Sequence, residues 1–204
     1  MKSYPSIPNH NKSKIPLGQP CIGFYKHDGS NLRWEWNKKR GWYKFGTRTR
    51  LFDETDEIFG EAIPLFLDTM ADEIVSKTTS LYNNLTDFIV YTEFLGESSF
   101  AGQHVVGEKK ELILFDVHIP RKGFIIPKEF IKHYNYDWVS PVVYQGNLNQ
   151  KLINDVRDNI YGLHEGMMCK GVDSKNMQWM VKIKTKEYLD KLKNKFGDDW
   201  EKMV

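Results

Sequence analysis

Cysteine is scarce in this chain. Cys21 and Cys169 are the two cysteines among 204 residues, and they do not have the paired spacing of a zinc site. The six histidines show no zinc-like spacing either. The sequence therefore predicts neither a disulfide framework nor a zinc centre, and we expect two buried, reduced thiols.

Long apolar runs are also missing. Nowhere do eighteen apolar residues follow one another, so no membrane span is predicted. The first nineteen residues are polar and rich in proline, without the apolar core of a signal peptide. We expect a soluble, cytoplasmic protein that does not associate with membranes.

An excess of charge of one sign is absent as well. Lysine and arginine total 29 against 27 aspartates and glutamates, a net charge of +2. The composition does not indicate a nucleic-acid-binding protein, so such a function would depend on local clustering. The chain is 40% hydrophobic and 14% aromatic, enough for a folded core. Its length predicts a single domain over residues 1–204.

The local patterns predict more strands than helices. Apolar, β-branched and aromatic runs predict strands at residues 21–26, 31–37, 42–46, 87–95, 111–119, 165–170 and 178–184. Helical spacing predicts helices at 59–82, 127–134, 147–159 and 185–200, with Asn147 as the N-cap of the third. Helices fall between runs of strands rather than in strict alternation, which favours an α+β fold with antiparallel sheets flanked by helices.

The first segment with chemical character is Lys26-His27-Asp28-Gly29-Ser30-Asn31, directly after a predicted strand. A lysine at such a junction suits a nucleophilic amine held against a phosphate. Gly29 permits close approach of the backbone to a ligand, and Asp28 can orient a neighbouring group. An ordinary Asp-Gly turn would have the same sequence.

Three further positions stand on or beside predicted strands. Arg48 belongs to the basic exit Gly46-Thr47-Arg48-Thr49-Arg50, and its planar guanidinium suits phosphate. Glu93 interrupts an apolar strand, where burial of a carboxylate requires a cation, a metal or good donors. Phe115 puts a ring on another strand. Taken singly, Arg48 also fits a solvated basic loop, Glu93 an edge-strand carboxylate that faces water, and Phe115 an aromatic residue of the core.

The last two segments place acid and base close together. Glu165-Gly166-Met167-Met168-Cys169-Lys170 runs from a carboxylate to Lys170. In Val181-Lys182-Ile183-Lys184, strand alternation puts Lys182 and Lys184 on one face. Two cations on one half-buried face repel each other unless an anion lies between them, although a solvated amphipathic strand explains the pair alone.

In this order and at these separations, the five segments resemble the nucleotidyltransferase motifs of the covalent ligase and mRNA capping enzyme superfamily. The resemblance extends over about residues 21–184. Phe45-Gly46-Thr47-Arg48 and the stretch Glu93-Phe94-Leu95-Gly96-Glu97-Ser98-Ser99-Phe100-Ala101-Gly102 look most like phage-type ATP-dependent RNA ligases. The resemblance implies a nucleotidyltransferase (ATP-grasp-like ligase) domain and a role in RNA repair.

The resemblance also implies roles for single residues. Lys26 matches the catalytic nucleophile that becomes lysyl-AMP. The nucleotide-binding positions that it implies are Asp28, Asn31, Arg48, Glu93, Phe115, Glu165, Lys170, Lys182 and Lys184. Within this set Phe115 matches the ring that stacks on adenine, Lys182 and Lys184 match the pair that holds the α-phosphate, and Lys170 is a weaker match. Glu93 and Glu165 are the implied metal ligands, with Glu97 as an alternative to Glu93.

The implied reaction uses ATP and Mg²⁺ or Mn²⁺, which suit hard oxygen ligands. A free lysine amine has a pKa near 10.4, and we expect Lys182, Lys184 and a divalent cation to lower the pKa of Lys26. AMP then passes from Lys26 to an RNA 5′-phosphate, and a 3′-hydroxyl displaces it. The expected partners are RNA ends, or DNA ends, held by two basic strips: Lys38, Lys39, Arg40, Arg48 and Arg50, and Lys186, Lys191, Lys193 and Lys195.

Several alternatives remain open. Many relatives carry a further C-terminal domain, whereas about twenty residues follow Lys184, so we expect no full accessory domain and allow for a protein partner in its place. A small ATP-dependent DNA ligase, a GTP-using capping enzyme and a catalytically inactive nucleotide- or RNA-binding module are the other readings. The sequence does not distinguish single-strand from nick substrates, the need for a splint, or the oligomeric state.

Overall fold

The computed structural model describes residues 3–97 and 107–203. Its contacts divide the chain into two compact units, which we describe separately. Unit 1 comprises Met1–Pro5, Asp28–Ile125 and Glu129–Val139, and unit 2 comprises Ser6–His27, Ile126–Lys128 and Ser140–Val204. The chain passes from unit 2 to unit 1 between His27 and Asp28, inside the Lys-x-Asp-Gly motif. The single domain over 1–204 stays a prediction.

Unit 1 is built on a six-stranded antiparallel sheet in the order β4-β3-β2-β5-β6-β7. Its strands are β2 (Ser30–Asn37), β3 (Gly41–Thr47), β4 (Leu51–Phe52), β5 (Asp87–Leu95), β6 (Glu111–Ile119) and β7 (Gly123–Phe124). The four strands predicted in this part of the chain are confirmed. The two-residue strands β4 and β7 were not predicted, because they are too short to produce a pattern.

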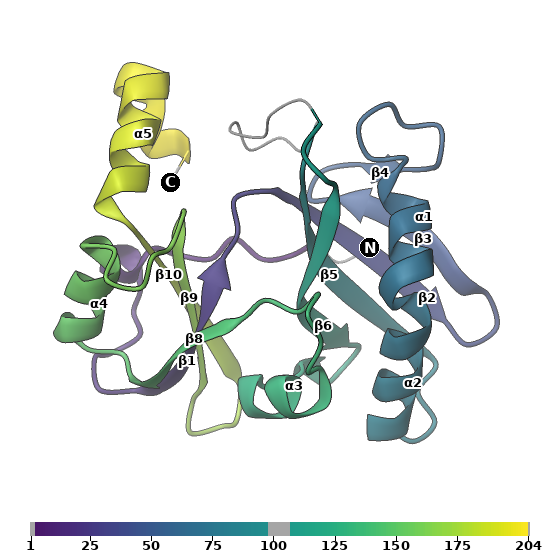
Figure 1. Ribbon diagram of the computed structural model, residues 1–204. Helices are drawn as coiled ribbons and strands as arrows, with labels where there is room; N and C mark the ends of the chain where they lie inside the picture. Colours follow the sequence, from purple (N-terminus) through teal and green to yellow (C-terminus); the bar gives the residue numbers. More distant parts are fainter. Residues whose placement is uncertain (1–2, 98–106, 204) are drawn as a thin grey trace. The chain divides into compact units, whose positions relative to one another are not determined.

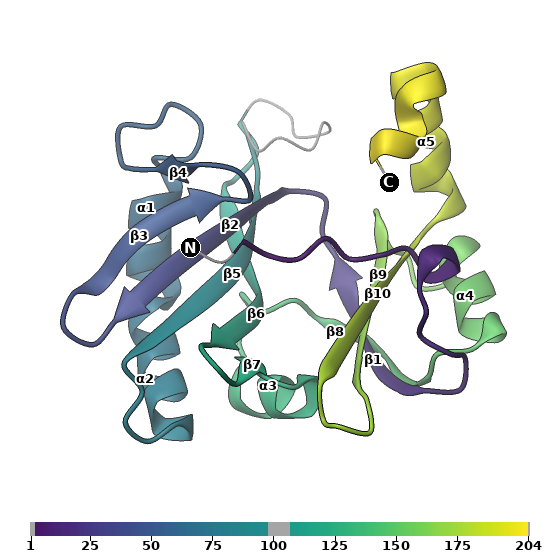
Figure 2. The same cartoon turned by 180° about the vertical axis from the view of Figure 1, so that it is seen from behind.

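The predicted helix at 59–82 is confirmed as three consecutive parts: α1 (Ala62–Phe66), a π-helical turn η2 (Leu67–Ala71) and α2 (Asp72–Leu81). Together they lie along one face of the sheet of unit 1 (Figures 1 and 2). The Phe66 ring stacks on Trp34 of β2, with centroids 4.1 Å apart. Because β2 alternates, Trp34 faces the helix and its neighbour Arg33 lies on the opposite face.

Unit 2 contains a four-stranded antiparallel sheet in the order β10-β9-β1-β8. Its strands are β1 (Pro20–Lys26), β8 (Val142–Asn147), β9 (Gly166–Val172) and β10 (Gln178–Lys184). The predicted strands 21–26, 165–170 and 178–184 correspond to β1, β9 and β10. Strand β8 was missed, because its residues are partly or fully exposed and lack an alternating apolar pattern.

The helix predicted at 147–159 is shorter than expected. Asn147 ends β8, so its prediction as the N-cap is wrong. Helix α4 (Gln150–Arg157) begins after Asn149, whose side chain accepts a hydrogen bond from the Leu152 amide at 2.8 Å. Both asparagines precede the apolar pattern, and the sequence alone did not show that the chain is still extended at residue 147.

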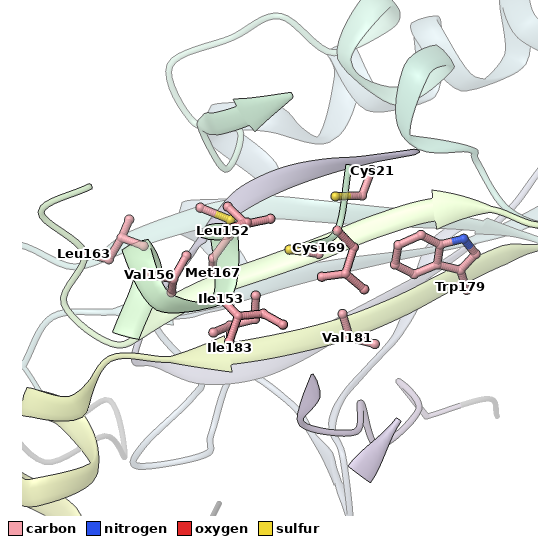
Figure 3. Packing of buried hydrophobic residues seen from close by; sticks show 11 residues of the cluster. Cys21, Leu152, Ile153, Val156, Leu163, Met167, Cys169, Trp179, Val181 and Ile183 are labelled. Carbon is pink, nitrogen blue, oxygen red and sulfur yellow. The ribbon is translucent and has the colours of Figure 1, made fainter. Parts of the chain in front are cut away.

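Helix α4 covers one face of the sheet of unit 2, as Figure 3 shows. The packed cluster consists of Cys21, Leu148, Leu152, Ile153, Val156, Leu163, Met167, Cys169, Trp179, Val181 and Ile183. Both cysteines are free and buried in it, as predicted. The lysines of β10 alternate with Val181 and Ile183 and therefore occupy the other face of the sheet.

The remaining helices are short. They are η1 (His10–Lys12), α3 (Pro127–His133), α5 (Lys186–Phe196) and η3 (Gly197–Met203). In α5, Leu192 is buried, whereas Tyr188, Leu189 and Phe196 are half-buried. Across the described ranges, every helix is too short or too polar to cross a bilayer. The chain is thus a mixed α and β protein with antiparallel sheets, as predicted.

Candidate functional site

A row of residues across three strands of unit 2 brings Lys26 and Lys184 to the same level of the sheet. Gly166 of β9 is in register with Lys26 of β1 on one side and with Lys184 of β10 on the other. Residues in register share a face of an antiparallel sheet. The predicted nucleophile and a predicted phosphate-binding lysine therefore lie on one face, opposite the hydrophobic cluster.

Glu165 lies between these two lysines. Its Oε2 atom is 2.5 Å from Lys26 Nζ, and its Oε1 atom is 3.0 Å from Lys184 Nζ. The side chains of Glu165 and Lys184 are 4% and 6% exposed, and that of Lys26 is 21% exposed. The anion required between two cations on a half-buried face is thus the carboxylate of the chain itself.

Backbone contacts hold Glu165 in place. Its carbonyl oxygen accepts a hydrogen bond from the Thr185 amide at 3.0 Å. Thr185 is also the N-cap of α5, because its hydroxyl oxygen accepts from the Tyr188 amide at 3.1 Å. Sequence reasoning missed Thr185, although a threonine directly before a helical pattern is a typical N-cap signal.

Gly166 allows β9 and β10 to approach closely at this level. A Cβ atom at residue 166 would lie 2.0 Å from the Ile183 carbonyl oxygen and 2.8 Å from the Lys184 Cα. Any side chain would therefore push the two strands apart. The glycine after Glu165 is required for the Glu165–Lys184 contact.

Lys182 and Lys170 lie on the same face of this sheet. Lys182 and Phe24 are both in register with Met168, and Lys170 is in register with Ile22 and Met180. Lys170 is buried, and its Nζ lies 4.8 Å from the centroid of the Phe24 ring. Unit 2 thus places four predicted lysines on one face, and Lys170 is the most deeply buried of them.

His27 follows Lys26 at the end of β1. The pKa of His27 is lowered to about 4, mainly by burial and in addition by the nearby Lys26 and His164, whereas Glu165 opposes this shift. The imidazole is therefore neutral at pH 7. Sequence reasoning gave no role to His27, because the motif alone does not show the protonation state of its histidine.

In unit 1, Gly29 and Glu93 are in direct contact. The Gly29 amide donates a hydrogen bond to Glu93 Oε1 at 3.1 Å. A Cβ atom at residue 29 would lie 2.4 Å from the Phe94 carbonyl oxygen and 2.9 Å from Glu93 Cγ. Asn31 is in register with Glu93, so β2 and β5 bring both predicted residues to the same position on the sheet.

The sheet face that carries Asn31 and Glu93 continues into a buried polar row. Arg33 is in register with Tyr91, which is in register with Asp116, and all three are buried. Sequence reasoning did not identify Arg33 or Asp116. The signal was present in β2, where the polar residues 31, 33 and 35 alternate with the apolar residues 32, 34 and 36.

Phe115 lies at an irregularity of β6. Tyr91 is in register with Asp116 and Thr92 with Leu114, so Phe115 is the extra residue of a β-bulge. The Tyr4 ring lies edge-on to Phe115 with centroids 5.0 Å apart, and its hydroxyl donates to Asp116 Oδ2 at 2.5 Å. Burial and the Asp116 carboxylate raise the pKa of Tyr4, which keeps the hydroxyl a donor.

Three other predicted positions belong to unit 1. Asp28 begins the long middle segment of the unit, Asp28–Ile125, and lies between β1 and β2. Arg48 is exposed in the turn between β3 and β4, which is closed by the hydrogen bond from the Thr47 amide to the Arg50 carbonyl at 2.8 Å. Glu97 follows β5, and its carboxylate accepts from the Gly107 amide at 2.9 Å. Ser98, Ser99, Phe100, Ala101 and Gly102 lie outside the described residues.

The first predicted basic strip is not continuous. Lys38, Lys39 and Arg40 form the turn before β3, and Arg48 follows the end of this seven-residue strand. At about 3.3 Å per residue the two groups are roughly 20 Å apart along the strand. Arg50 also forms an ion pair with Asp56. The prediction of one strip from these five residues is therefore wrong.

The second strip divides in a similar way. At about 100° per residue, Lys186 and Lys193 of α5 share a face, while Lys191 and Lys195 point about 140–180° away from it. Three of these lysines also have acidic partners: Lys186 pairs with Asp158, Lys191 with Glu187 and Lys193 with Asp190. The helix is basic, but its lysines do not form the single predicted strip.

The predicted site residues thus form two groups. Unit 2 holds Lys26, Glu165, Lys170, Lys182 and Lys184, and unit 1 holds Asp28, Asn31, Arg48, Glu93 and Phe115. Among residues 3–97 and 107–203, no group of three or more histidine, cysteine, aspartate or glutamate side chains could hold a metal ion. Mg²⁺ is typically held by one or two carboxylates together with water and substrate phosphates, and such a site needs no larger cluster.

No protein-family model and no curated protein match this chain. Solved structures do match it. The RNA ligase of Naegleria gruberi with PPi covers 95% of the chain at a TM-score of 0.66 and 15% identity. A mutant of the same ligase with AMP and Mn covers 93% at 0.65 and 17% identity. A protein of Aquifex aeolicus proposed to be an ATP-dependent DNA ligase covers 100% at 0.65 and 17% identity.

The likeness to these structures concerns the fold. The chain spans 58% of the length of the Naegleria chains and 57% of the Aquifex chain. Over that part, the chain shares the fold of these structures.

Proposed function

We propose that this chain is the nucleotidyltransferase part of an ATP-dependent polynucleotide ligase, and that its substrate is RNA. In this proposal Lys26 becomes lysyl-AMP, AMP passes to an RNA 5′-phosphate, and a 3′-hydroxyl then displaces AMP to seal the strand. The observation that carries the proposal is the contact of Glu165 with both Lys26 and Lys184, in a chain with the fold of known ligases.

The first step forms a bond between Lys26 Nζ and the α-phosphorus of ATP and breaks the bond from that phosphorus to the pyrophosphate oxygen. The attacking amine must lose a proton, and Glu165 Oε2, 2.5 Å away, is placed to accept it. Lys184 and Lys182 share the sheet face of Lys26 and are the cations that stabilise the charge on the nonbridging phosphate oxygens. When a phosphate replaces Glu165 as the partner of Lys184, the carboxylate is released for the amine.

The resemblance supports roles for Glu93 and Phe115 in binding the nucleoside part of ATP. Glu93, beside Asn31 in the sheet, accepts a ribose hydroxyl, and the Phe115 ring stacks on adenine. Arg48 contacts phosphate. Glu165 and Glu93 are each proposed, from the resemblance, as a ligand of Mg²⁺ or Mn²⁺, and such an ion would neutralise charge on the phosphate oxygens. The AMP, ATP and Mn present in the Naegleria structures support these ligands.

RNA is preferred as the substrate on two grounds. The segments at residues 45–48 and 93–102 look most like phage-type ATP-dependent RNA ligases, and the Naegleria structures are RNA ligases. The Aquifex structure matches the whole chain and favours a DNA ligase as the second candidate. Parallel assays of an RNA nick and a DNA nick of the same sequence distinguish the two.

The test is incubation of the pure protein with α-labelled ATP and Mg²⁺, followed by denaturing electrophoresis. We expect label on the wild type and on Lys175→Ala, which alters an exposed lysine of the turn between β9 and β10, and none on Lys26→Ala. Label that survives in Lys26→Ala would move the nucleophile elsewhere. If ATP and GTP both fail to label the wild type and mass spectrometry finds no attached AMP, the chain is an inactive nucleotide- or RNA-binding module.

A further inference from the structure

We propose that Tyr25 is a positioning residue for lysine adenylylation: its hydroxyl oxygen fixes the backbone directly before Glu165 and so holds that carboxylate against Lys26. The inference rests on the proposed function. It concerns residues of unit 2 alone, and its basis is the hydrogen bond from the His164 amide to the Tyr25 hydroxyl oxygen at 3.1 Å.

Glu165 needs such support because it does not belong to a strand. Strand β9 begins at Gly166, and residues 162–165 form the irregular segment before it. On the C-terminal side, the Thr185 amide binds the Glu165 carbonyl oxygen at 3.0 Å. On the N-terminal side, the hydroxyl oxygen of Tyr25 binds the peptide one residue earlier. The two contacts hold the backbone on both sides of the residue that carries the carboxylate.

Tyr25 is itself firmly fixed. Its amide donates to the Pro141 carbonyl oxygen at 2.9 Å, and its carbonyl oxygen accepts from Ser140 Oγ at 2.8 Å. It is also in register with Met167 of β9. Because Tyr25 and Lys26 are consecutive residues of β1, a bond from Tyr25 to the Glu165 segment relates the carboxylate to the backbone that carries the nucleophile.

The ring of Tyr25 lies on the other face of the sheet from Lys26. It packs against the hydrophobic cluster, and its centroid is 4.6 Å from that of His27 and 6.1 Å from that of His164. Successive strand residues point to opposite faces, so the Tyr25 side chain does not contact the reacting atoms. It acts through Glu165, and this separation from the amine defines a positioning residue.

Small displacements in such a site have large effects. A shift of about 1 Å of a reacting or orienting group can lower a rate about 100-fold. Loss of the Tyr25 hydroxyl leaves the ring and the packing, so we expect a partial displacement of Glu165. The expected result is a 5- to 30-fold lower rate constant for lysyl-AMP formation, with the KM for ATP within about twofold of the wild type.

The experiment compares Tyr25→Phe with Tyr144→Phe in single-turnover labelling by α-labelled ATP. Tyr144 packs against the same cluster, and its hydroxyl donates to the Asn147 carbonyl oxygen at 3.0 Å, away from Glu165. Tyr144→Phe therefore removes a comparable hydrogen bond from the same part of the protein. Melting temperatures and the amide exchange of His164 and Glu165, followed by NMR, are measured on both variants.

The proposal is supported if lysyl-AMP forms slowly in Tyr25→Phe and at the normal rate in Tyr144→Phe. It also requires faster exchange of the His164 amide in Tyr25→Phe alone. Equal rates in both variants, or a rate loss explained by unfolded protein at the assay temperature, overturn it. No label on the wild type would overturn the proposed function and the catalytic part of this inference together. In that case the amide exchange still shows whether Tyr25 holds the segment before Glu165.

Discussion

The amine of Lys26 lies 2.5 Å from the Glu165 carboxylate, although 139 residues separate the two in the chain. The same carboxylate contacts Lys184 at 3.0 Å, so one negative charge serves two positive ones. The expectation that cations surround Lys26 therefore accounts for Lys184 but leaves out the carboxylate of Glu165. A carboxylate between the two amines allows them to share a half-buried face before any nucleotide binds.

Removal of Glu165 is expected to destabilise the protein. Glu165→Ala removes the carboxylate that contacts the buried Lys184 at 3.0 Å, and we expect the free energy of unfolding to fall by about 3 kcal/mol. The control is Asp155→Ala, which removes the partner of the exposed Lys151 and should lower it by less than about 1 kcal/mol. Urea unfolding measures both, and equal losses would mean that the Glu165 contacts contribute no more than a surface pair.

Alanine substitutions of Lys182 and Lys184 are expected to have different effects on the free energy of unfolding but similar effects on the rate of lysyl-AMP formation. If both hold the α-phosphate, each substitution by alanine lowers the rate of lysyl-AMP formation about 100-fold or more. Lys184 is buried and paired with Glu165, so Lys184→Ala should also lower the free energy of unfolding. Lys182 is half-buried, so Lys182→Ala should change the free energy of unfolding by about 0.5 kcal/mol. Labelling rates and urea unfolding test this, and a normal rate in either variant would remove that lysine from the phosphate site.

Gly166→Ala is expected to disturb both stability and the site. The added Cβ would lie 2.0 Å from the Ile183 carbonyl oxygen, so strands β9 and β10 must separate, which typically costs about 1–3 kcal/mol or more. Gly162→Ala is the calibration, because residue 162 also has an unusual backbone (φ +65°) but its added Cβ meets no atom within 4 Å. We expect Gly166→Ala to unfold at clearly lower urea concentration than Gly162→Ala and to lose labelling activity. Equal midpoints would contradict the close approach.

His27 is expected to make the protein less stable in acid. Its pKa is about 4 in the folded protein against an ordinary 6.5, so between these values the unfolded chain binds more protons. The stability contributed by neutral His27 is complete above pH 6.5 and is lost as the pH falls toward 4, by about 3 kcal/mol in total. Urea unfolding from pH 7 to 4 should show a smaller loss in His27→Gln, and identical pH profiles would contradict it.

The strands with strong patterns could be read from the sequence to the residue. Residues 87–95, 111–119 and 178–184 match β5, β6 and β10, because each is a long apolar or alternating run that ends at a turn. Strand β8 carries no such pattern, since its residues are mostly exposed and its order in the sheet comes from pairing with β1. Its absence from the prediction led directly to the misplaced cap at Asn147.

The candidate site could also be predicted only in part, because the sequence does not show the register of the strands. The resemblance pointed to Lys26, Glu165 and Lys184, whose roles stay predictions, but only register shows that Gly166 aligns the two lysines. The role of Tyr25 depends on a backbone amide of a residue 139 positions away, and no sequence pattern contains that information. The basic strips failed because residues near in sequence were assumed to be near in space, although a whole strand separates Lys38 from Arg48.

The position of β1 has a consequence for the order of folding during synthesis. This strand is made before most of unit 1, yet both of its neighbours, β8 and β9, follow unit 1 in the sequence. Unit 1 is largely one continuous stretch and can fold as it emerges, whereas β1 has to wait for residues up to 172. A ribosome-bound chain halted after unit 1 would therefore contain Lys26 without its sheet, and the amine acquires its neighbours Glu165 and Lys184 only after residue 184 has been made.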